Sequence, residues 1–558
     1  MFDIKKIPFS RYGSYIAIST LWDSDDLYIR TVRGGDINTN NGKVFKIETV
    51  DNNGDNVPYE VDMKEHVLTL SCDNGYVKFC IDNVNNLRVY GKGIGLKLTM
   101  ECGYYDNCIN IGNDKYKINS ATNDIKYLIT NKHGSIEVKA PWNIQRSEYI
   151  EFIFTPKEYF YGIIEEFKTV PRYEDYDSSF LVCEERVRKS YKNWLDNVLD
   201  VSHKYKRGKE LASYITWSCV VNKDNNLTRD AMYMSKNWMT NIWSWDNCFN
   251  AMALIKNNPK LAYDQLMIFF DMQDDSGLLP DFANDKYSSF SFTKPPIHGW
   301  TIDYMIKENP KFFNNNRLKE LYRPLKKWTD YWFKYTDYDY NNIPSYDHGN
   351  DAGWDNSTIF DNGSPVKSPD LLSFLILNMK TLSHMAGEIG LKSEANYYEK
   401  AMKHYINLLI EYFYIDNNFV PKDLNDNIKY DGDSLIMCVP IILGQLLPKE
   451  ITNKIADDIE DRFLTEHGLS TESIYSKYYR DDGYWRGPIW APSTIIIVDG
   501  LERSGHGKLA REISHRFLNM VNKNGMAENF NAKTGEGLRD KAFTWTSSVF
   551  LILGNKYK

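Results

Sequence analysis

Residues 368–390, SPDLLSFLILNMKTLSHMAGEIG, contain the strongest helical signal in the chain. Ser368 is a typical N-cap residue, Pro369 suits the first helical position, and Asp370 favours the positive end of the helix dipole. Apolar residues then recur with helical spacing, which predicts one buried face, until Gly390 ends the helix. The apolar positions are Leu371, Leu375, Met379, Leu382, Ala386 and Ile389.

Neighbouring segments repeat this pattern, notably 314–335, 393–413 and 506–522. From about residue 181 onward the periodicity predicts roughly a dozen helices. Loops rich in aromatic residues and glycine separate them. Helices in such number can close as an (α/α)6 barrel or stack as an open solenoid, and periodicity alone does not distinguish these architectures.

The first part of the chain has a different pattern. Short stretches alternate polar and apolar residues, and clusters of Asn, Asp and Gly provide turns between them. Examples are SYIAIST (14–20), KVFKIETV (43–50) and EYIEFIF (148–154). We therefore expect an antiparallel β-sandwich over residues 1–168, a linker over 169–182 and an all-α domain over 183–558.

Composition excludes several classes of protein. The 558 residues are 42% hydrophobic and 25% charged, which indicates a folded multidomain protein. A mean hydropathy of -0.51 and the lack of a long apolar run argue against a membrane span, and a net charge of -8 argues against nucleic-acid binding. Eight scattered cysteines without a CxxC pair indicate reduced thiols, and the N-terminus lacks signal-peptide features. We expect a cytoplasmic protein of unassigned oligomeric state.

A set of loops is too rich in Trp, Asp and Gly to serve only as connections. Aromatic rings fringed by polar side chains suit a sugar, and cleaving a glycosidic bond requires an acid and a base. A single Asp beside Gly usually marks a turn, and a single Trp usually lies in the core. Their joint occurrence indicates a carbohydrate site. The blocks, numbered first to fifth, are IWSWDN (242–247); GLLPD (277–281) with KPPIHGW (294–300); YDHGNDAGWDNS (346–357); YWRGPIW (484–490); and ENFN (528–531) with FTWT (543–546).

In content and order, these blocks resemble glycoside hydrolase family 63, which includes α-glucosidases and mannosylglycerate hydrolases and is related to the family 37 trehalases. The resemblance covers most of residues 235–550. It implies an (α/α)6 barrel after the sandwich, and hydrolysis with inversion at the anomeric carbon. One departure is Ala352, because the family commonly has Ser there, and this puts the details of substrate binding in doubt.

The resemblance also implies residue roles. Asp355 would be the general acid, kept protonated by a desolvated aromatic pocket, and Glu528 would be the ionised general base that holds the nucleophilic water. The implied substrate-binding residues are Trp243, Asp246, Gln273, Trp300, Asp351, Trp354, Trp485 and Arg486. No cofactor or metal ligand is expected, since DYDYN (337–341) lacks the Gly and Glu of a calcium loop, which favours a turn over a structural calcium site.

The sequence thus predicts an inverting exo-acting hydrolase that removes terminal α-linked glucosyl or mannosyl residues from short oligosaccharides or glycosides. A glycoside phosphorylase and a non-catalytic sugar-binding protein on the same scaffold are the alternatives. The presence of both Asp355 and Glu528, without an added basic cluster for phosphate, favours hydrolysis. The sugar, its linkage and the leaving group stay open.

Overall fold

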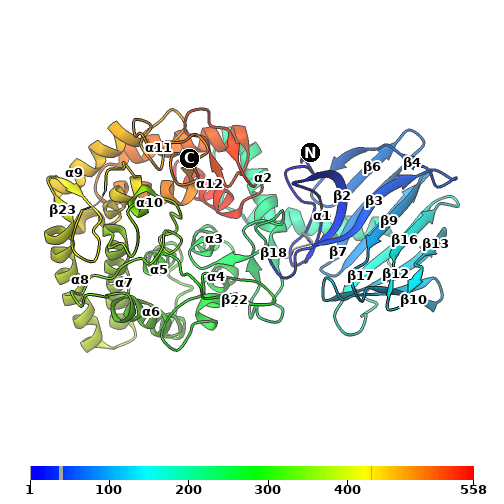
Figure 1. Ribbon diagram of the computed structural model, residues 1–558, viewed down its shortest axis with the longest axis horizontal. Helices are drawn as coiled ribbons and strands as arrows, with labels where there is room; N and C mark the ends of the chain where they lie inside the picture. Colours follow the sequence, from blue (N-terminus) through cyan, green and yellow to red (C-terminus); the bar gives the residue numbers. More distant parts are fainter. Residues whose placement is uncertain (1, 37–41, 429) are drawn as a thin grey trace.

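The protein consists of a β domain and a helical domain that lie side by side (Figure 1). The computed structural model describes residues 2–36, 42–428 and 430–558. Within these residues no helix is long and apolar enough to cross a membrane. All eight cysteines are free thiols; five are buried, whereas Cys72, Cys102 and Cys108 are only half-buried.

Two antiparallel sheets form the β domain, as predicted. One sheet has the order β1-β2-β3-β9-β16-β13, with β4 beside β3, and the other has the order β10-β11-β12-β17-β8-β7-β6-β5. The first sheet comprises β1 (Ile16–Leu21), β2 (Ser24–Thr31), β3 (Lys43–Val50), β4 (Asn56–Val57), β9 (Gly95–Glu101), β13 (Ser135–Lys139) and β16 (Tyr149–Thr155). The second comprises β5 (Glu60–Met63), β6 (Leu68–Cys72), β7 (Gly75–Asn83), β8 (Asn86–Lys92), β10 (Asn107–Gly112), β11 (Lys115–Ser120), β12 (Ile125–His133) and β17 (Phe160–Phe167).

Alternation along the strands places aromatic side chains between the two sheets. In β16, Ile150, Phe152 and Phe154 are fully buried, whereas the residues between them are only half-buried. Phe154 meets Phe160 of the facing sheet with ring centroids 5.6 Å apart. This period-two burial is what the sequence pattern predicted for a sandwich.

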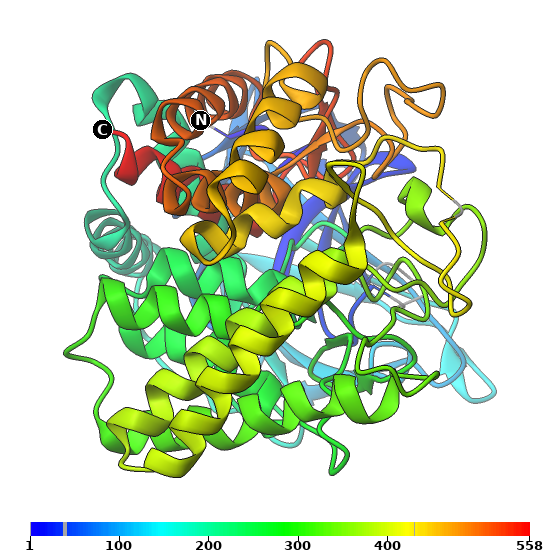
Figure 2. The ribbon, with the colours of Figure 1, turned by 90° about the vertical axis from the view of Figure 1, so that its left-hand side faces the viewer.

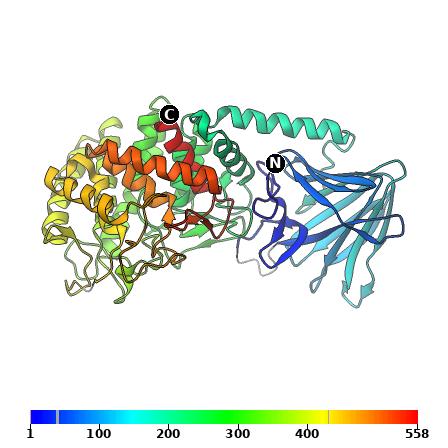
Figure 3. The ribbon, with the colours of Figure 1, turned by 90° about the horizontal axis from the view of Figure 1, so that it is seen from above.

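Helix α1 (Phe180–Asn197) joins the two domains. It follows β17, contacts β7 and β8 of the second sheet, and also packs against α2 of the helical domain. Figure 3 shows it running along the top of the molecule and over the β domain.

Six inner segments of the helical domain form a closed ring. Each contacts the next in the order α3, α5, α7, η3, α10 and α12, and α12 contacts α3 again. They are α3 (Asp246–Leu254), α5 (His298–Glu308), α7 (Pro369–Glu388), the 3-10 segment η3 (Leu435–Leu446), α10 (Ala491–Arg503) and α12 (Thr544–Lys556). Ring closure excludes the open solenoid and confirms the (α/α)6 barrel.

An outer layer of helices covers this ring, and the whole barrel stands in front of the β domain in Figure 2. The outer helices are α2 (Lys206–Ser218), α4 (Pro259–Asp271), α6 (Asn315–Tyr335), α8 (Lys392–Phe413), α9 (Lys449–Asp458) and α11 (Gly507–Asn524). In the β domain, the short strands β14 (Trp142–Asn143) and β15 (Arg146–Ser147) pair with each other between β13 and β16. Short elements also join the helices of the barrel: η1 (His203–Tyr205), β18 (Val220–Val221), β19 (Ala231–Met232), β20 (Ile242–Trp243), β21 (Phe282–Ala283), β22 (Ser288–Ser289), η2 (Thr358–Phe360), β23 (Tyr414–Ile415), β24 (Asn418–Phe419), η4 (Ile459–Phe463), β25 (Ile489–Trp490), β26 (Asn529–Phe530) and β27 (Gly537–Leu538).

Helix α7 differs from its sequence prediction in two details. It is buried on more than one face, because an inner helix packs against both the ring and the outer layer. Ser368 occupies the N-cap position, but its hydroxyl donates to the Asp370 carboxylate and caps no backbone N–H. The predicted cap is therefore replaced by a side-chain pair that Tyr346 joins, with its hydroxyl 2.9 Å from Asp370.

Candidate active site

The fourth and fifth blocks form one small sheet that positions Glu528. Strand β26, which begins directly after Glu528, pairs with β25 of the fourth block and with β27. The Glu528 backbone N–H donates to the Asp540 carbonyl at 2.7 Å, and the Trp545 indole donates to the Glu528 carbonyl at 3.1 Å. The backbone of Glu528 is thus fixed on both sides.

Three carboxylates from three different blocks lie within electrostatic reach of the phenol of Tyr484. Burial raises the pKa of Tyr484 well above its ordinary value, and the charges of Asp355, Glu528 and Asp246 raise it further. Tyr484 has a φ of 63°, a left-handed conformation that is uncommon outside glycine. The structure therefore brings Asp355 and Glu528, which are far apart in sequence, to one place.

Glu528 and Asp355 differ in how deeply their carboxyl groups are buried. Glu528 is only 4% exposed, and this burial, with the charges of Asp540 and Asp246, raises its pKa to about 8 while Arg539 opposes the shift. Asp355 is half-buried. The sequence analysis expected a desolvated, protonated Asp355 and an ionised Glu528; in the structure Glu528 is the more deeply buried of the two, and this burial favours its protonated form.

Asp246 is the third member of this group. It is the first residue of α3 and is 4% exposed, and burial raises its pKa to about 8 although Lys294 opposes the shift. The Lys294 ammonium lies 3.2 Å from Asp281 and donates to the Asn350 carbonyl at 2.9 Å. Asn350 in turn donates to Asp281 at 3.1 Å. These contacts tie the second block to the third beside Asp246.

Tryptophans from four blocks form one buried cluster around Trp485. Its ring stacks on Trp490 with centroids 4.1 Å apart and an angle of 6°, and it also lies 4.8 Å from Trp354 and 6.2 Å from Trp245. Trp545 closes the cluster at 5.4 Å from Trp490. The cluster fixes the loops that carry the carboxylates.

Gly353 is required by this packing. It has a φ of 69°, and a Cβ atom at this position would lie 2.6 Å from the Trp245 ring. Both the backbone conformation and the space therefore favour glycine. The contact with Trp245 thus explains why glycine precedes Trp354 and Asp355 in the third block.

Asn356 and Arg486 join the third block to the fourth. The Asn356 amide donates to the Gly483 carbonyl at 3.0 Å and accepts the Trp485 backbone N–H at 2.9 Å. Arg486 donates from Nε to the Asn356 carbonyl at 2.7 Å and pairs with Asp361. The guanidinium expected to hold sugar hydroxyls is thus engaged in tying two loops together.

The remaining predicted binding residues occupy varied positions. Trp243 is half-buried, with its ring 5.7 Å from Phe282. Gln273 donates its amide to the carbonyls of Gly277 and Pro324, and Trp300, 1% exposed, donates its indole N–H to Asp499 at 2.7 Å. Asp351 accepts the backbone N–H groups of Thr293 and His348, each at 2.9 Å. Gln273, Trp300 and Asp351 therefore already have protein partners that support loops or core.

Sequence reasoning missed several residues that surround the carboxylates. Tyr484, Asp281 and Lys294 lie inside the quoted blocks but were not selected, and their position in those blocks was a usable signal. Arg539 and Asp540 lie between the two halves of the fifth block, where no local pattern pointed to them. Arg539 lies over the Tyr484 ring, 4.9 Å from its centroid, and pairs with Asp482.

The β domain reaches this group of residues through a short chain of hydrogen bonds. Arg30 of β2 donates to the Asn237 carbonyl at 2.5 Å. Asn237 donates its amide to the Asp540 carboxylate at 2.9 Å, and the Asp540 carbonyl accepts the Glu528 N–H. The β domain thus supports the segment that carries Glu528.

The segment DYDYN (337–341), for which the sequence favoured a turn over a calcium site, forms a turn. Asp337 accepts the backbone N–H groups of Asn341 and Asn342 at 3.1 and 2.9 Å, and Asp339 pairs with Lys367. Over the described ranges, no three His, Cys, Asp or Glu side chains are grouped as a metal site.

Carboxylates from separate loops beside a tryptophan cluster, on an (α/α)6 barrel, form the arrangement expected of a glycoside hydrolase of the barrel class. Residues 239–546 match the family described as "Mannosylglycerate hydrolase MGH1-like glycoside hydrolase domain". Since this match covers more than half of the chain, the chain belongs to that family, within glycoside hydrolase family 63.

One curated relative and two solved structures show what the chain resembles; the structures share its fold. The chain is 19% identical over 395 residues to mannosylglycerate hydrolase MGH2 of Selaginella moellendorffii, covering 55% of this chain and 79% of the relative. It resembles the solved family 63 mannosylglycerate hydrolase of Thermus thermophilus with a TM-score of 0.51 and 16% identity, over 55% of this chain and 92% of that one. A bacterial glucoamylase solved with acarbose matches 99% of this chain and 94% of its own, with a TM-score of 0.65 and 10% identity, and so shares the whole two-domain fold.

Proposed function

We propose that this glycoside hydrolase is an inverting, exo-acting enzyme that removes a terminal α-linked glucosyl or mannosyl residue from short glycosides. The observation that carries the proposal is that Asp355 and Glu528, which are far apart in sequence, both lie within electrostatic reach of Tyr484. Two carboxyl groups that flank one site supply the acid and base that glycosidic cleavage requires. The relatives named mannosylglycerate hydrolase and glucoamylase support both sugars.

The difference in burial supports the division of roles. The acid must reach the oxygen of the departing group, which leaves toward solvent, and Asp355 is the half-buried carboxyl. The base must hold one water on the far side of the sugar, and Glu528 is the deeply buried carboxyl with Arg539 beside it. Asp355 is therefore assigned as the acid and Glu528 as the base.

The proposed reaction balances with these two groups. Asp355 donates its proton to the glycosidic oxygen as the bond from that oxygen to the anomeric carbon breaks. Glu528 takes a proton from water, whose oxygen bonds to the opposite face of the same carbon, and this inverts its configuration. Proton exchange with solvent then returns a proton to Asp355 and removes one from Glu528; because burial raises the pKa of Glu528 to about 8, its ionised form becomes more populated, and the reaction faster, as the pH rises toward 8.

Other residues would hold the terminal sugar. Asp246 is buried beside the pair and would accept hydrogen bonds from sugar hydroxyls, while Lys294 fixes its surroundings. Trp243, which is half-buried, would supply an apolar surface for the C–H faces of the ring, whereas the buried Trp354 and Trp485 hold the surrounding loops in place. The burial of Glu528 and Asp246 leaves little open surface, which favours a chain end over the interior of a polymer.

The test is proton NMR of the sugar first released from α-glucosides, α-mannosides and mannosylglycerate, with and without phosphate. The proposal expects the β-anomer first, independent of phosphate and lost in Asp355→Asn and Glu528→Gln. The α-anomer as first product would contradict inversion. A sugar 1-phosphate would indicate a phosphorylase, and sugar binding without turnover would indicate a binding protein.

A further inference from the structure

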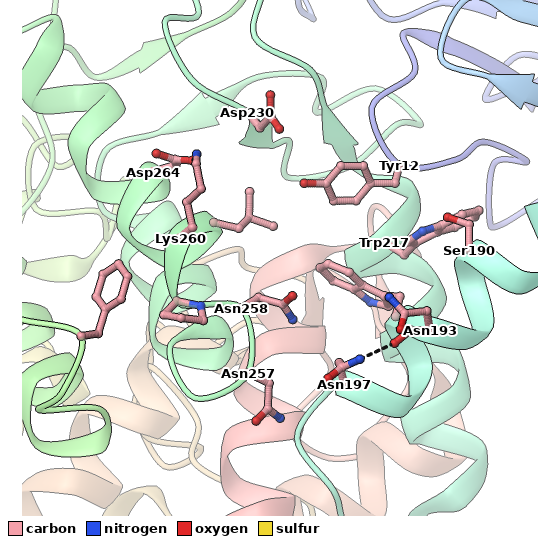
Figure 4. A pocket seen from close by; sticks show the side chains of 14 residues that line it. Tyr12, Ser190, Asn193, Asn197, Trp217, Asp230, Asn257, Asn258, Lys260 and Asp264 are labelled. Atoms are coloured by element: carbon pink, nitrogen blue, oxygen red, sulfur yellow. Dashed lines mark hydrogen bonds and ion pairs between the residues drawn. The ribbon is translucent and has the colours of Figure 1, made fainter.

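A second hollow of about 580 Å³ lies where the two domains meet on α1, α2 and α4 (Figure 4). This volume is within the range of roughly 300–1,000 Å³ typical of small-molecule sites. Helix α3 separates it from the catalytic carboxylates, because Asp246 begins that helix and Asn257 and Asn258, which line the hollow, follow its end. At 1.5 Å per residue, these nine helical residues span about 13 Å.

The hollow presents side-chain amides that have no protein partner. The amides of Asn193, Asn257 and Asn258 line it, and none makes a hydrogen bond to another described residue. Asn258 is the N-cap residue of α4, yet its side chain does not cap the helix. Each amide offers two donors and one acceptor oxygen, so a ligand could use them without breaking an internal bond.

Aromatic side chains line the same hollow. Tyr12 and Trp194 line the hollow with ring centroids 5.8 Å apart. Trp194 is 7% exposed, and its indole N–H is buried without a hydrogen-bond partner in the described part of the chain. Burial and the nearby carboxylates of Asp230 and Asp264 raise the pKa of Tyr12, so its phenol remains a hydrogen-bond donor.

The charges around the hollow exclude an anionic ligand. Among the residues that the structure describes, its only lining cation is Lys260, which pairs with Asp264 at 2.6 Å, and Asp230 adds a further carboxylate. Asp264 also pairs with Arg229 at 3.2 Å, so the nearby charges balance and the described part of the lining offers a phosphate or carboxylate no unpaired cation. A ligand whose neutral hydroxyls pair with amides and whose C–H faces lie on rings satisfies the lining better than an ion or a purely apolar molecule.

We propose that this hollow is a second binding site, separate from the catalytic site, for a neutral saccharide of one or two rings. Asn193, Asn257 and Asn258 bind its hydroxyls, and Tyr12 and Trp194 provide the apolar wall. The site requires no bond to break, and it does not depend on which carboxyl is the catalytic acid.

Fluorine NMR of the full-length Glu528→Gln protein, labelled with 5-fluorotryptophan, tests this site while slowing sugar consumption. The Trp194 and Trp485 signals are assigned with Trp194→Phe and Trp485→Phe. Added maltose or trehalose is expected to shift the Trp194 signal to saturation. Asn193→Ala and Asn258→Ala should each weaken this binding about two- to tenfold, the usual effect of one net hydrogen bond.

Lys192→Ala is the matched control, because Lys192 is exposed on α1 beside Asn193 and does not line the hollow. It should leave the Trp194 titration unchanged. The proposal is overturned if neither sugar moves the Trp194 signal in a protein whose Trp485 signal responds. It is also overturned if sodium phosphate binds more tightly than either sugar, or if Lys192→Ala weakens binding as much as Asn193→Ala.

Discussion

The two segments that carry the central carboxylates are held in place by different means. Glu528 precedes a strand of a three-stranded sheet, is covered by Trp545 and is almost fully buried. Asp355 lies in an irregular loop that side chains such as Asn356 and Arg486 tie to its neighbours, and it is half-buried. A carboxyl that holds a single water benefits from rigid enclosure, whereas one that protonates a departing group must stay near solvent.

The largest expected effect comes from removing the charge at the enclosed carboxyl. Glu528→Gln should lower kcat by about 10²–10⁴-fold, the usual contribution of a general acid or base. Glu536→Gln is the control, because Glu536 is exposed on the same hairpin. Steady-state kinetics on the best substrate from the NMR panel measures both variants. Equal losses in the two would mean that the hairpin, and not the carboxyl, matters.

The pH dependence of stability tests whether Glu528 is as deeply buried as its environment indicates. The folded-state pKa of Glu528 is about 8, above its ordinary value of 4.5, so folding favours the protonated form. Wild-type stability should therefore fall by up to about 1.4 kcal/mol per pH unit between these values, whereas Glu528→Gln lacks this loss. The melting temperature of the glutamine variant should exceed that of wild type increasingly from pH 5 to pH 8. A constant difference would mean that Glu528 is not desolvated.

In the loop of Asp355, Gly353 provides the next largest effect. Gly353→Ala should destabilise the fold by about 2–4 kcal/mol, since it combines left-handed strain with a clash against Trp245. Gly390→Ala has comparable strain at a φ of 84° but open space around it, so it should cost only about 1–2 kcal/mol. Urea unfolding compares the two. Equal costs would show that the loop yields to the added methyl group.

The smallest effect concerns the tie between Arg486 and Asp361. If Arg486 positions the loop, then Asp361→Asn should reproduce most of the effect of Arg486→Gln, a rise in KM of about two- to fivefold with stability lowered by up to about 1 kcal/mol. If Arg486 instead binds sugar directly, Arg486→Gln alone would raise KM. Kinetics and thermal melts of the two variants and their double mutant separate these roles.

Much of the architecture followed from the sequence. Alternating stretches such as KVFKIETV became strands, and the helix predicted from Ser368 to Gly390 lies at those positions. The helical periodicity of the sequence could not predict that the ring closes, because closure depends on a contact between α3 and α12, which is the last helix of the chain. The Ser368 cap failed because Asp370 competes for the hydroxyl.

The sequence also predicted some features of the candidate site and missed others. Family resemblance placed Asp355, Glu528 and Asp246 in blocks that the structure brings together. It could not show that the guanidinium of Arg486 faces Asn356 and Asp361, or that Trp300 lies in the core with Asp499 as its partner. Two further features depend on tertiary contacts that no local sequence pattern encodes. These are the burial of Glu528, which raises its pKa, and the position of Arg539 over the Tyr484 ring.

The hydrogen-bond path from Arg30 through Asn237 and Asp540 to Glu528 makes the support of the proposed base depend on the β domain. A barrel transferred to another N-terminal partner would lose the donor that orders Asn237, and with it part of the support for its base. Substitutions of Arg30 in β2 are therefore expected to be compensated on the barrel side, even though no residue of that strand is needed to touch a sugar, whereas relatives that match mainly the barrel must support the base by other contacts.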